Sequence, residues 1–233
     1  MNKKILFVIV EGMSDDEAIH VVLSRIFRDK NVLVKIYHGD ISSEIGVHPT
    51  NIASRINKIV REYIKDYHLK MKDLYKIVQI TDTDGTYIDD ELIVYDGDLD
   101  EVIYSEDTIK TSNPQNIIER NQRKSINLNR LASINDISNV AYEIYYMSSN
   151  LDHVLYNKLN TSNYEKEINA HNFSKKYKDQ PEEFIKFMTE SDFSVKASYK
   201  ETWDYIKKEN NSLKRHTNFG ICFKDLEDDL NRC

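Results

Sequence analysis

Residues 5–12 carry the sequence Ile-Leu-Phe-Val-Ile-Val-Glu-Gly, in which six apolar residues run unbroken to a glutamate and a glycine. A short apolar, β-branched run is typical of a strand that is buried on both faces, as the strands of parallel sheets are. Asp15 and Asp16 follow at the start of a segment whose apolar residues recur at helical spacing. Acids are favoured in the first turn of a helix. The stretch therefore predicts a buried strand, a tight turn at Gly12 and a helix capped by Ser14.

The same alternation of strand and helix patterns continues along the chain. Apolar runs predict three further strands, at residues 32–37, 75–81 and 141–147, besides short β-like pieces at 92–95 and 102–104. Between the first two of these strands, residues 52–64 have an apolar stripe at helical spacing. The order predicts an α/β fold with a doubly wound, mostly parallel sheet and right-handed crossovers. Because the C-terminal third has helical patterns only, we expect residues 1–160 to form the sheet domain and residues 161–233 a helical C-terminal part packed on it.

Composition narrows the class of protein. The 233 residues include 39 acidic and 32 basic side chains, a net charge of −7, and 40% hydrophobic residues. This balance is typical of a globular domain, and it argues against nucleic-acid binding by bulk positive charge while leaving room for a bridging metal ion. The two cysteines, Cys222 and Cys233, favour a reducing cytosol over a secreted disulfide scaffold. The chain lacks an apolar stretch of about 18 residues, so we expect a cytoplasmic protein with no membrane span.

Acidic residues follow two of the predicted strands at the point where each strand ends. Glu11 and Gly12 end the first strand, and Asp82-Thr83-Asp84-Gly85 ends the third. Ligands bind at the carboxyl ends of the strands in open α/β sheets, so we expect Glu11, Asp82 and Asp84 to converge there. Crowded carboxylates repel one another unless a cation joins them, and oxygen ligands of this kind suit Mg²⁺ or Mn²⁺.

Other polar residues near this edge are weaker candidates. The residues that would support metal or substrate there are Gly12, Ser14, Asp15, Gly85, Asn150 and Asp152. Asn150 and Asp152, with His153 behind them, follow the fourth predicted strand and equally suit the N-cap of a helix. Asp40 follows the second predicted strand and is a further candidate.

Basic side chains could contact phosphate. Lys196, which lies with Lys200 at the start of a predicted helix, could neutralise charge on a phosphate in the transition state. The most basic local stretch is a candidate strip for backbone phosphates and contains Arg120, Arg123, Lys124 and Arg130. In both places an ordinary solvated helix surface is the alternative.

The two acidic strand ends resemble those of the Toprim domain, which occurs in topoisomerases, bacterial primases and the overcoming-lysogenization-defect (OLD) nucleases. The strand ending at Glu11-Gly12 and the later strand ending in Asp82-x-Asp84 carry this resemblance, which covers roughly residues 3–85. Within the family, the chain is similar to stand-alone bacterial proteins such as the RloB-like and AriB-type abortive-infection effectors. The resemblance implies a metal-dependent nuclease acting on DNA or RNA, with Glu11 as metal ligand or general acid–base and Asp82 and Asp84 as metal ligands. It also implies an anti-phage role, with room for an ATPase or sensor partner and for homo-oligomers.

Two alternatives start from the same residues. The apolar strand followed by Asp82-Thr83-Asp84-Gly85-Thr86 also resembles the first motif of haloacid-dehalogenase-type phosphatases, which implies Asp82 as nucleophile and Asp84 as acid–base. That motif usually opens its fold, whereas two strands and two helices precede it here. The acidic group at residues 227–229 lies in an expected helix at 223–230 and not after an apolar strand. The other alternative is a non-enzymatic module that binds a metal or a partner through the acidic cluster.

Overall fold

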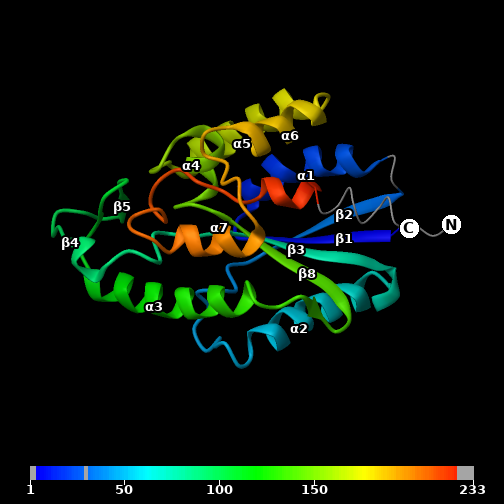
Figure 1. The fold of residues 1–233 in the computed structure, drawn as a ribbon, viewed down its shortest axis with the longest axis horizontal. Coiled ribbons are helices and arrows are strands. Elements are labelled where there is room, and N and C mark those ends of the chain that lie inside the picture. The colour runs from blue at the N-terminus through cyan, green and yellow to red at the C-terminus, as the bar shows by residue number, and fades with distance from the viewer. Residues whose placement is uncertain (1–3, 29–30, 225–233) are drawn as a thin grey trace. The chain divides into compact units, whose positions relative to one another are not determined.

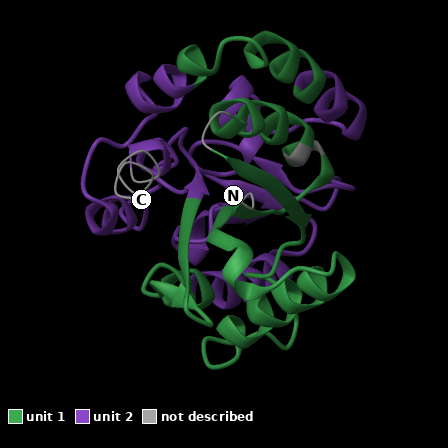
Figure 2. Cartoon of the chain, turned by 90° about the vertical axis from the view of Figure 1, so that its right-hand side faces the viewer, with its two compact units in different colours: residues 1–80, 126–145, 170–184 green, residues 81–125, 146–169, 185–233 purple. Residues whose placement is uncertain are grey.

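The computed structural model describes residues 4–28 and 31–224 (Figure 1). The chain divides into two compact units, each built from three stretches of sequence (Figure 2). Unit 1 comprises residues 1–80, 126–145 and 170–184, and unit 2 comprises residues 81–125, 146–169 and 185–233. The boundary expected at residue 160 stays a prediction. Cys233, the acidic group at 227–229 and most of the helix expected at 223–230 lie outside the described residues.

Unit 1 contains most of a five-stranded sheet. Its strands are β1 (Lys4–Val10), β2 (Val32–His38), β3 (Leu74–Asp82), β7 (Asp136–Ile137) and β8 (Val140–Met147), in the order β2-β1-β3-β8-β7. β1 pairs in parallel with β2 on one side and with β3 on the other, so that Phe7 is opposite both Lys35 and Ile77. β7 pairs antiparallel with β8 at the far edge. The sheet is mostly parallel, which confirms the predicted α/β class, while the Toprim-specific topology stays a prediction.

The order of these strands creates a switch point at β1. The chain passes from β1 to β2 on one side of β1, and then returns to form β3 on its other side. In open α/β sheets this is the place where ligands bind, beyond the carboxyl ends of the strands on either side of the switch. Glu11 directly follows β1, and β3 ends at Asp82, so the two predicted acidic strand ends belong to the two strands that meet there.

The apolar run at residues 5–10 lies in the centre of the sheet. Each of its residues is at most 3% exposed, which confirms a strand buried on both faces. Helices α1 (Met13–Phe27) and α2 (Ile52–Asp66), both of unit 1, lie on opposite faces of the sheet (Figure 1). The ring of Tyr63 in α2 packs edge-on against Phe7 with 4.9 Å between centroids. The predicted stripe of α2 supplies buried contacts through Ile52, Ile56, Ile59 and Val60.

Unit 2 contains a smaller sheet. Its strands are β4 (Ile93–Tyr95), β5 (Ile103–Tyr104) and β6 (Ile109–Thr111), with β6 between a parallel β4 and an antiparallel β5. Its core is an apolar cluster formed by Ile88, Ile93, Ile109, Ile117 and Leu213. The short strands β6 and β7 are absent from the sequence prediction, since two or three residues are too few to show a period.

The described residues contain five further α-helices, of which α3, α5 and α6 each include residues of both units. They are α3 (Pro114–Leu131), α4 (Leu151–Tyr156), α5 (Asn163–Tyr177), α6 (Pro181–Glu190) and α7 (Tyr199–Ile206). The positions of α5, α6 and α7 confirm the helical character predicted for much of the C-terminal third of the chain. Within the part of the chain that the structure describes, no helix is both long and apolar enough to cross a membrane.

Truncation of the central strand tests its contribution to stability. Phe7→Ala should lower the free energy of unfolding by about 3–5 kcal/mol, because it removes a fully buried ring and leaves a cavity. Leu33→Ala, on β2 at a position that is 40% exposed, should cost less than about 1 kcal/mol and is the matched control. Urea unfolding followed by circular dichroism measures both values. Equal losses in the two variants would contradict the central position of β1.

Candidate metal centre

The turn after β3 is held by backbone hydrogen bonds within unit 2. The Thr83 amide donates to the Met147 carbonyl at 2.9 Å, and the Asp84 amide donates to the Ser149 carbonyl at 2.7 Å. The Thr83 hydroxyl donates to the Ser212 carbonyl at 2.8 Å and accepts from the Ser149 amide at 2.9 Å. Asp84 has a positive φ of 49°, a conformation that Asp tolerates better than most residues. These hydrogen bonds fix the backbone position of Asp84, and therefore the position of its Cα atom.

Glycine is required at position 85, in the turn that follows β3. Its φ is +67°, and a Cβ atom there would lie 2.6 Å from Cδ2 of Leu213 and 2.9 Å from Cδ1 of Ile109. The apolar cluster of unit 2 therefore packs directly against this backbone. The Asn121 side-chain amide also donates to the Gly85 carbonyl at 3.3 Å.

A buried lysine pairs with Asp84. Lys124, on α3, is 0% exposed, and its Nζ donates to Oδ2 of Asp84 at 2.5 Å. The Arg120 guanidinium donates to the Asp84 carbonyl and to the Tyr104 hydroxyl, both at 2.7 Å. A charged side chain is buried at large cost unless it is paired, so Lys124 and Asp84 constrain each other's position. Two of the four basic residues predicted as a phosphate strip thus contact the turn that carries the carboxylate.

The acidic end of β1 begins the α1 helix in unit 1. Glu11 is half-buried at the strand end, and Gly12 is the N-cap of α1. The Gly12 amide donates to Oδ2 of Asp15 at 2.8 Å. Asp15 therefore caps the helix, a role in which a carboxylate complements the helix dipole. The prediction that Ser14 caps this helix was wrong, because α1 begins at Met13 and Ser14 lies in its first turn. The side chain of Ser14 lies outside what the structure describes.

Asp40 is held by two serines just after β2. Its Oδ1 accepts from the Ser42 hydroxyl at 2.8 Å and from the Ser43 amide at 3.1 Å, while the Ser43 hydroxyl donates to Oδ2. Ser42 is fully buried, and Asp40 is half-buried. The carboxylate is thereby oriented by short local hydrogen bonds, as in other Asx turns.

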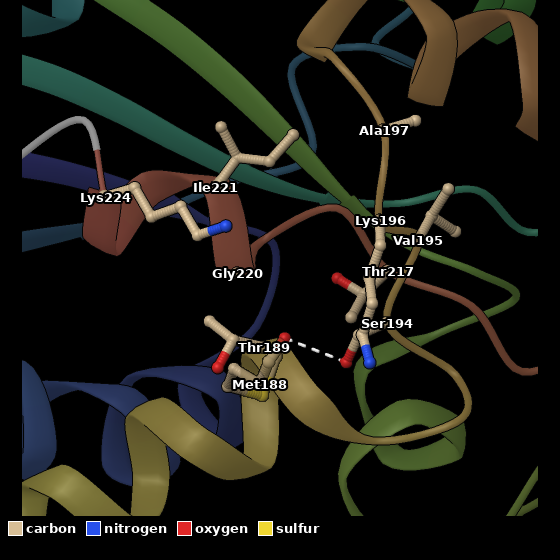
Figure 3. Close-up of a pocket in the computed structure, with 10 residues that line it drawn as sticks. All are labelled: Met188, Thr189, Ser194, Val195, Lys196, Ala197, Thr217, Gly220, Ile221 and Lys224. Atoms are coloured by element: carbon tan, nitrogen blue, oxygen red, sulfur yellow. Dashed lines mark hydrogen bonds between the residues drawn. The ribbon is translucent and has the colours of Figure 1, made fainter.

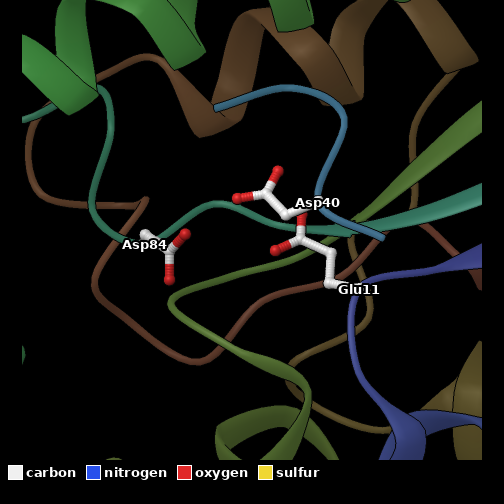
Figure 4. A group of neighbouring side chains, drawn as sticks. All are labelled: Glu11, Asp40 and Asp84. Atoms are coloured by element: carbon white, nitrogen blue, oxygen red, sulfur yellow. The ribbon is translucent and has the colours of Figure 1, made fainter. Parts of the chain in front are cut away.

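Three carboxylates form a group that could hold a metal ion (Figure 4). Glu11, Asp40 and Asp84 each offer one oxygen, these oxygens all lie within 4.8 Å of one another, and all three residues are half-buried. With Lys124 on Asp84, the four side chains carry a formal charge of −3 + 1 = −2. Oxygen ligands at a site of this charge suit a hard divalent cation, which would offset the repulsion between the acids. The donor set therefore fits the predicted kind of cofactor.

This group differs in one member from the set predicted from the sequence. Asp40, a weaker candidate, is part of it, whereas Asp82 is not among its three residues. Asp82 lines a cavity of about 570 Å³ in unit 2 together with Asp84. The sequence feature that indicated Asp40 as a member of the group is its position after the second strand. That strand, β2, pairs in parallel with β1 and ends at the same edge of the sheet.

The cavity beside Asp84 has a polar and mostly acidic lining. Its charged residues are Asp82, Asp84, Glu101, Glu165 and Lys166, and Tyr104, Asn150, Asn160 and Thr161 also line it. Four carboxylates and one ammonium would repel an anionic ligand unless a cation were also present. Asp84 is common to the lining of this cavity and to the carboxylate group.

Asn150 and Asp152 have structural partners beside this cavity. Oδ1 of Asn150 accepts from the His153 amide at 2.8 Å, so Asn150 is the N-cap of α4 while it also lines the cavity. Asp152 is only 6% exposed, and the Thr161 hydroxyl donates to it at 2.6 Å. Burial raises the pKa of Asp152, and the hydrogen bond from Thr161 works in the opposite direction.

The predicted phosphate-neutralising lysine lines a different cavity. Nζ of Lys196 donates to the Glu190 carbonyl at 3.3 Å, and Lys196 is not among the residues that line the cavity beside Asp84. Lys200 forms an exposed ion pair with Asp204 at 3.4 Å. Lys124, another basic residue considered from the sequence, does contact a carboxylate of the group, that of Asp84.

The turn at Gly85 can be tested against a glycine of similar backbone conformation. Gly85→Ala should destabilise the protein by about 2–5 kcal/mol, because left-handed strain and a clash with Leu213 and Ile109 both act. Gly46→Ala, where φ is +85° and no atom lies within 4 Å of the added Cβ, should cost only about 1 kcal/mol. Thermal and urea unfolding of both variants measure the difference. Similar losses would mean that packing against Gly85 contributes nothing.

Stability should fall in mild acid because of a buried histidine. His153 is 2% exposed, its Nδ1 has no hydrogen-bond partner among the described residues, and burial lowers its pKa to about 4. Between about pH 6.5 and pH 4 the unfolded chain binds a proton that the folded chain does not, so stability decreases as the pH falls through this window. His153→Leu should reduce this pH dependence measured by urea unfolding. The exposed control His48→Leu should leave it unchanged, and an unchanged slope in His153→Leu would contradict the prediction.

The geometry of this centre rests on two buried or half-buried supports, the serines on Asp40 and the lysine on Asp84. No protein-family model matches the chain, and neither a curated protein nor a solved structure is significantly similar to it.

Proposed function

We propose that this protein is a divalent-metal-dependent nuclease that hydrolyses phosphodiester bonds of DNA or RNA at the group formed by Glu11, Asp40 and Asp84. The observation that carries the proposal is the approach of three carboxylate oxygens, all within 4.8 Å of one another, at the carboxyl ends of strands. Mg²⁺ and Mn²⁺ are the cations that such ligands prefer. Both cations are used to cleave phosphate esters.

We assign metal-binding and positioning roles to the residues of the group and to their hydrogen-bond partners. Glu11, Asp40 and Asp84 would hold the ion, which when bound supplies Lewis-acid stabilisation of the negative charge on phosphate and a source of nucleophilic water. The buried ammonium of Lys124 would hold Asp84 in one orientation, and Ser42 would do the same for Asp40. Preorganised groups of this kind lower the barrier because they need not rearrange during the reaction.

The cavity beside Asp84 would receive the substrate. Its volume of about 570 Å³ is in the range typical of sites for small ligands, about 300–1,000 Å³. Asp82 lines it and is the second carboxylate that a substrate would meet there. Because four of its five charged residues are acidic, binding of a phosphate should depend strongly on the divalent ion. The anti-phage role, the ATPase partner and homo-oligomers stay predictions of the family resemblance.

Cleavage assays with the full chain test this proposal. Plasmid, single-stranded DNA and tRNA should be cut with Mg²⁺ or Mn²⁺ and left intact with EDTA. Glu11→Gln, Asp40→Asn and Asp84→Asn should each lower the rate about 100-fold or more, since each removes a ligand whose loss costs more than that of a supporting residue. The same variants should bind Mn²⁺ more weakly in calorimetric titrations.

Matched controls come from exposed acids of unit 2. Asp90→Asn and Glu106→Gln make the same chemical changes outside the group and should cleave and bind Mn²⁺ like the unmodified protein. Cleavage that survives in the Glu11→Gln/Asp84→Asn double variant would overturn the proposal. Hydrolysis of p-nitrophenyl phosphate with all nucleic acids left intact would support the phosphatase alternative instead.

A further inference from the structure

A second cavity in unit 2 is formed by the end of α6, the segment after it and the chain near Gly220 (Figure 3). It encloses about 330 Å³ and contains none of the residues of the carboxylate group. Residues 188–189 and 194–197 supply one wall, and Thr217, Gly220, Ile221 and Lys224 supply the other. This volume is at the lower end of the range for small-molecule sites, about 300–1,000 Å³.

The interior of this cavity is apolar in character. Met188 and Thr217 are buried in it, and Val195 and Ile221 are half-buried beside them. The hydroxyl groups of the lining already donate hydrogen bonds to the backbone: Thr217 to Tyr146 at 2.7 Å, Ser194 to Met188 at 2.9 Å and Thr189 to Ile185 at 2.8 Å. The hydroxyl hydrogens are therefore used within the protein, and the lining presents mainly methyl and methylene groups to a ligand.

A close backbone contact holds the two walls together. A Cβ atom on Gly220 would lie only 2.5 Å from the Met188 carbonyl oxygen and 3.2 Å from Cα of Thr189. The start of the segment at 220–224 thus lies directly against the end of α6. The cavity is consequently bounded by packed backbone on this side.

The charge at the cavity is positive. Lys196 and Lys224 are the charged residues of its lining, and no acid of residues 4–28 and 31–224 lines it. Nζ of Lys196 donates only to the Glu190 carbonyl, and among the described residues neither ammonium forms an ion pair with a carboxylate. This is unusual on a chain of net charge −7, and it is the reverse of the cavity beside Asp84, where acids predominate.

We propose that this cavity binds a small organic anion, with one phosphate or carboxylate group held between Lys196 and Lys224 and an apolar body against Met188, Val195 and Ile221. Two ammonium groups that form no ion pair with a carboxylate of the described residues would gain charge-assisted hydrogen bonds from such a group. The apolar body would be removed from water by the methyl and methylene lining. The site does not depend on the proposed nuclease activity, because it shares no residue with the carboxylate group.

A series of matched six-carbon ligands tests the proposal by calorimetric titration into the full chain. Hexyl phosphate and hexanoate carry both required features, whereas hexanol lacks the charge, hexylammonium reverses it, and inorganic phosphate lacks the apolar body. At least one of the two organic anions should bind at least about tenfold more tightly than the other three probes. The stronger of the two identifies the head group. Equal binding of hexanol, tighter binding of hexylammonium, or no binding of either anion would overturn the proposal.

Substitutions at the two lysines locate the site. Lys196→Gln and Lys224→Gln should each weaken the tighter anion about fivefold or more, and the double variant should bind it no better than hexanol. Lys208→Gln, which removes an exposed lysine outside the lining, should bind like the unmodified protein. Ile221→Trp should fill the cavity and abolish binding. Unchanged affinity in the double lysine variant, with unchanged thermal unfolding, would contradict the assignment.

Discussion

The parallel pairing of β1 with both of its neighbours is the constraint on which the candidate centre depends. Since β2 and β3 run in the same direction as β1, all three strands end at one edge of the sheet, and the acids that follow them begin from that edge. Glu11 follows β1, Asp40 follows β2 and Asp84 follows β3 within two residues of each strand end. The same pairing requires residues 5–10 to be apolar throughout, because a strand in the centre of a covered parallel sheet meets helices on both faces. Core formation and placement of the acids therefore have a common cause.

Electrostatics explains why these acids need partners. Three carboxylates at such short separations repel one another, and local hydrogen bonds and an ion pair hold Asp40 and Asp84 in place. Asp40 is held by Ser42 and Ser43, and Asp84 is held by the buried ammonium of Lys124. The three carboxylates and Lys124 carry a formal charge of −2, and a divalent cation would reduce the repulsion between the acids. This balance supports a metal centre more strongly than the acids taken singly.

Two cavities of unit 2 have opposite character. The one beside Asp84 is polar and has four acids and one lysine in its lining, whereas the one beside Gly220 is mainly apolar and has two lysines and no acid. The first suits a phosphate only together with a cation, and the second suits an anion directly. The net charge of −7 predicts neither cavity, because it is summed over the whole chain and does not show where acidic and basic residues cluster.

The sequence by itself determined the elements and the strongest candidates. Six consecutive apolar residues before Glu11, and the apolar strand before Asp82, specified buried strands of an α/β sheet, because periodicity and burial are local properties of the chain. It also placed Glu11 and Asp84 at strand ends.

Only the tertiary structure decided which other side chains join them. Lys124 lies 40 residues from Asp84 along the chain and looked like part of a solvated basic helix, and its burial depends on the packing of α3 against the turn at Gly85. In sequence, Asp40 looks like many other acidic residues that follow a strand in a turn. Its place in the group depends on the parallel register of β2 with β1. Long-range pairing of this kind leaves no periodic trace in the sequence, since it depends on which surfaces meet and not on the order of neighbouring residues.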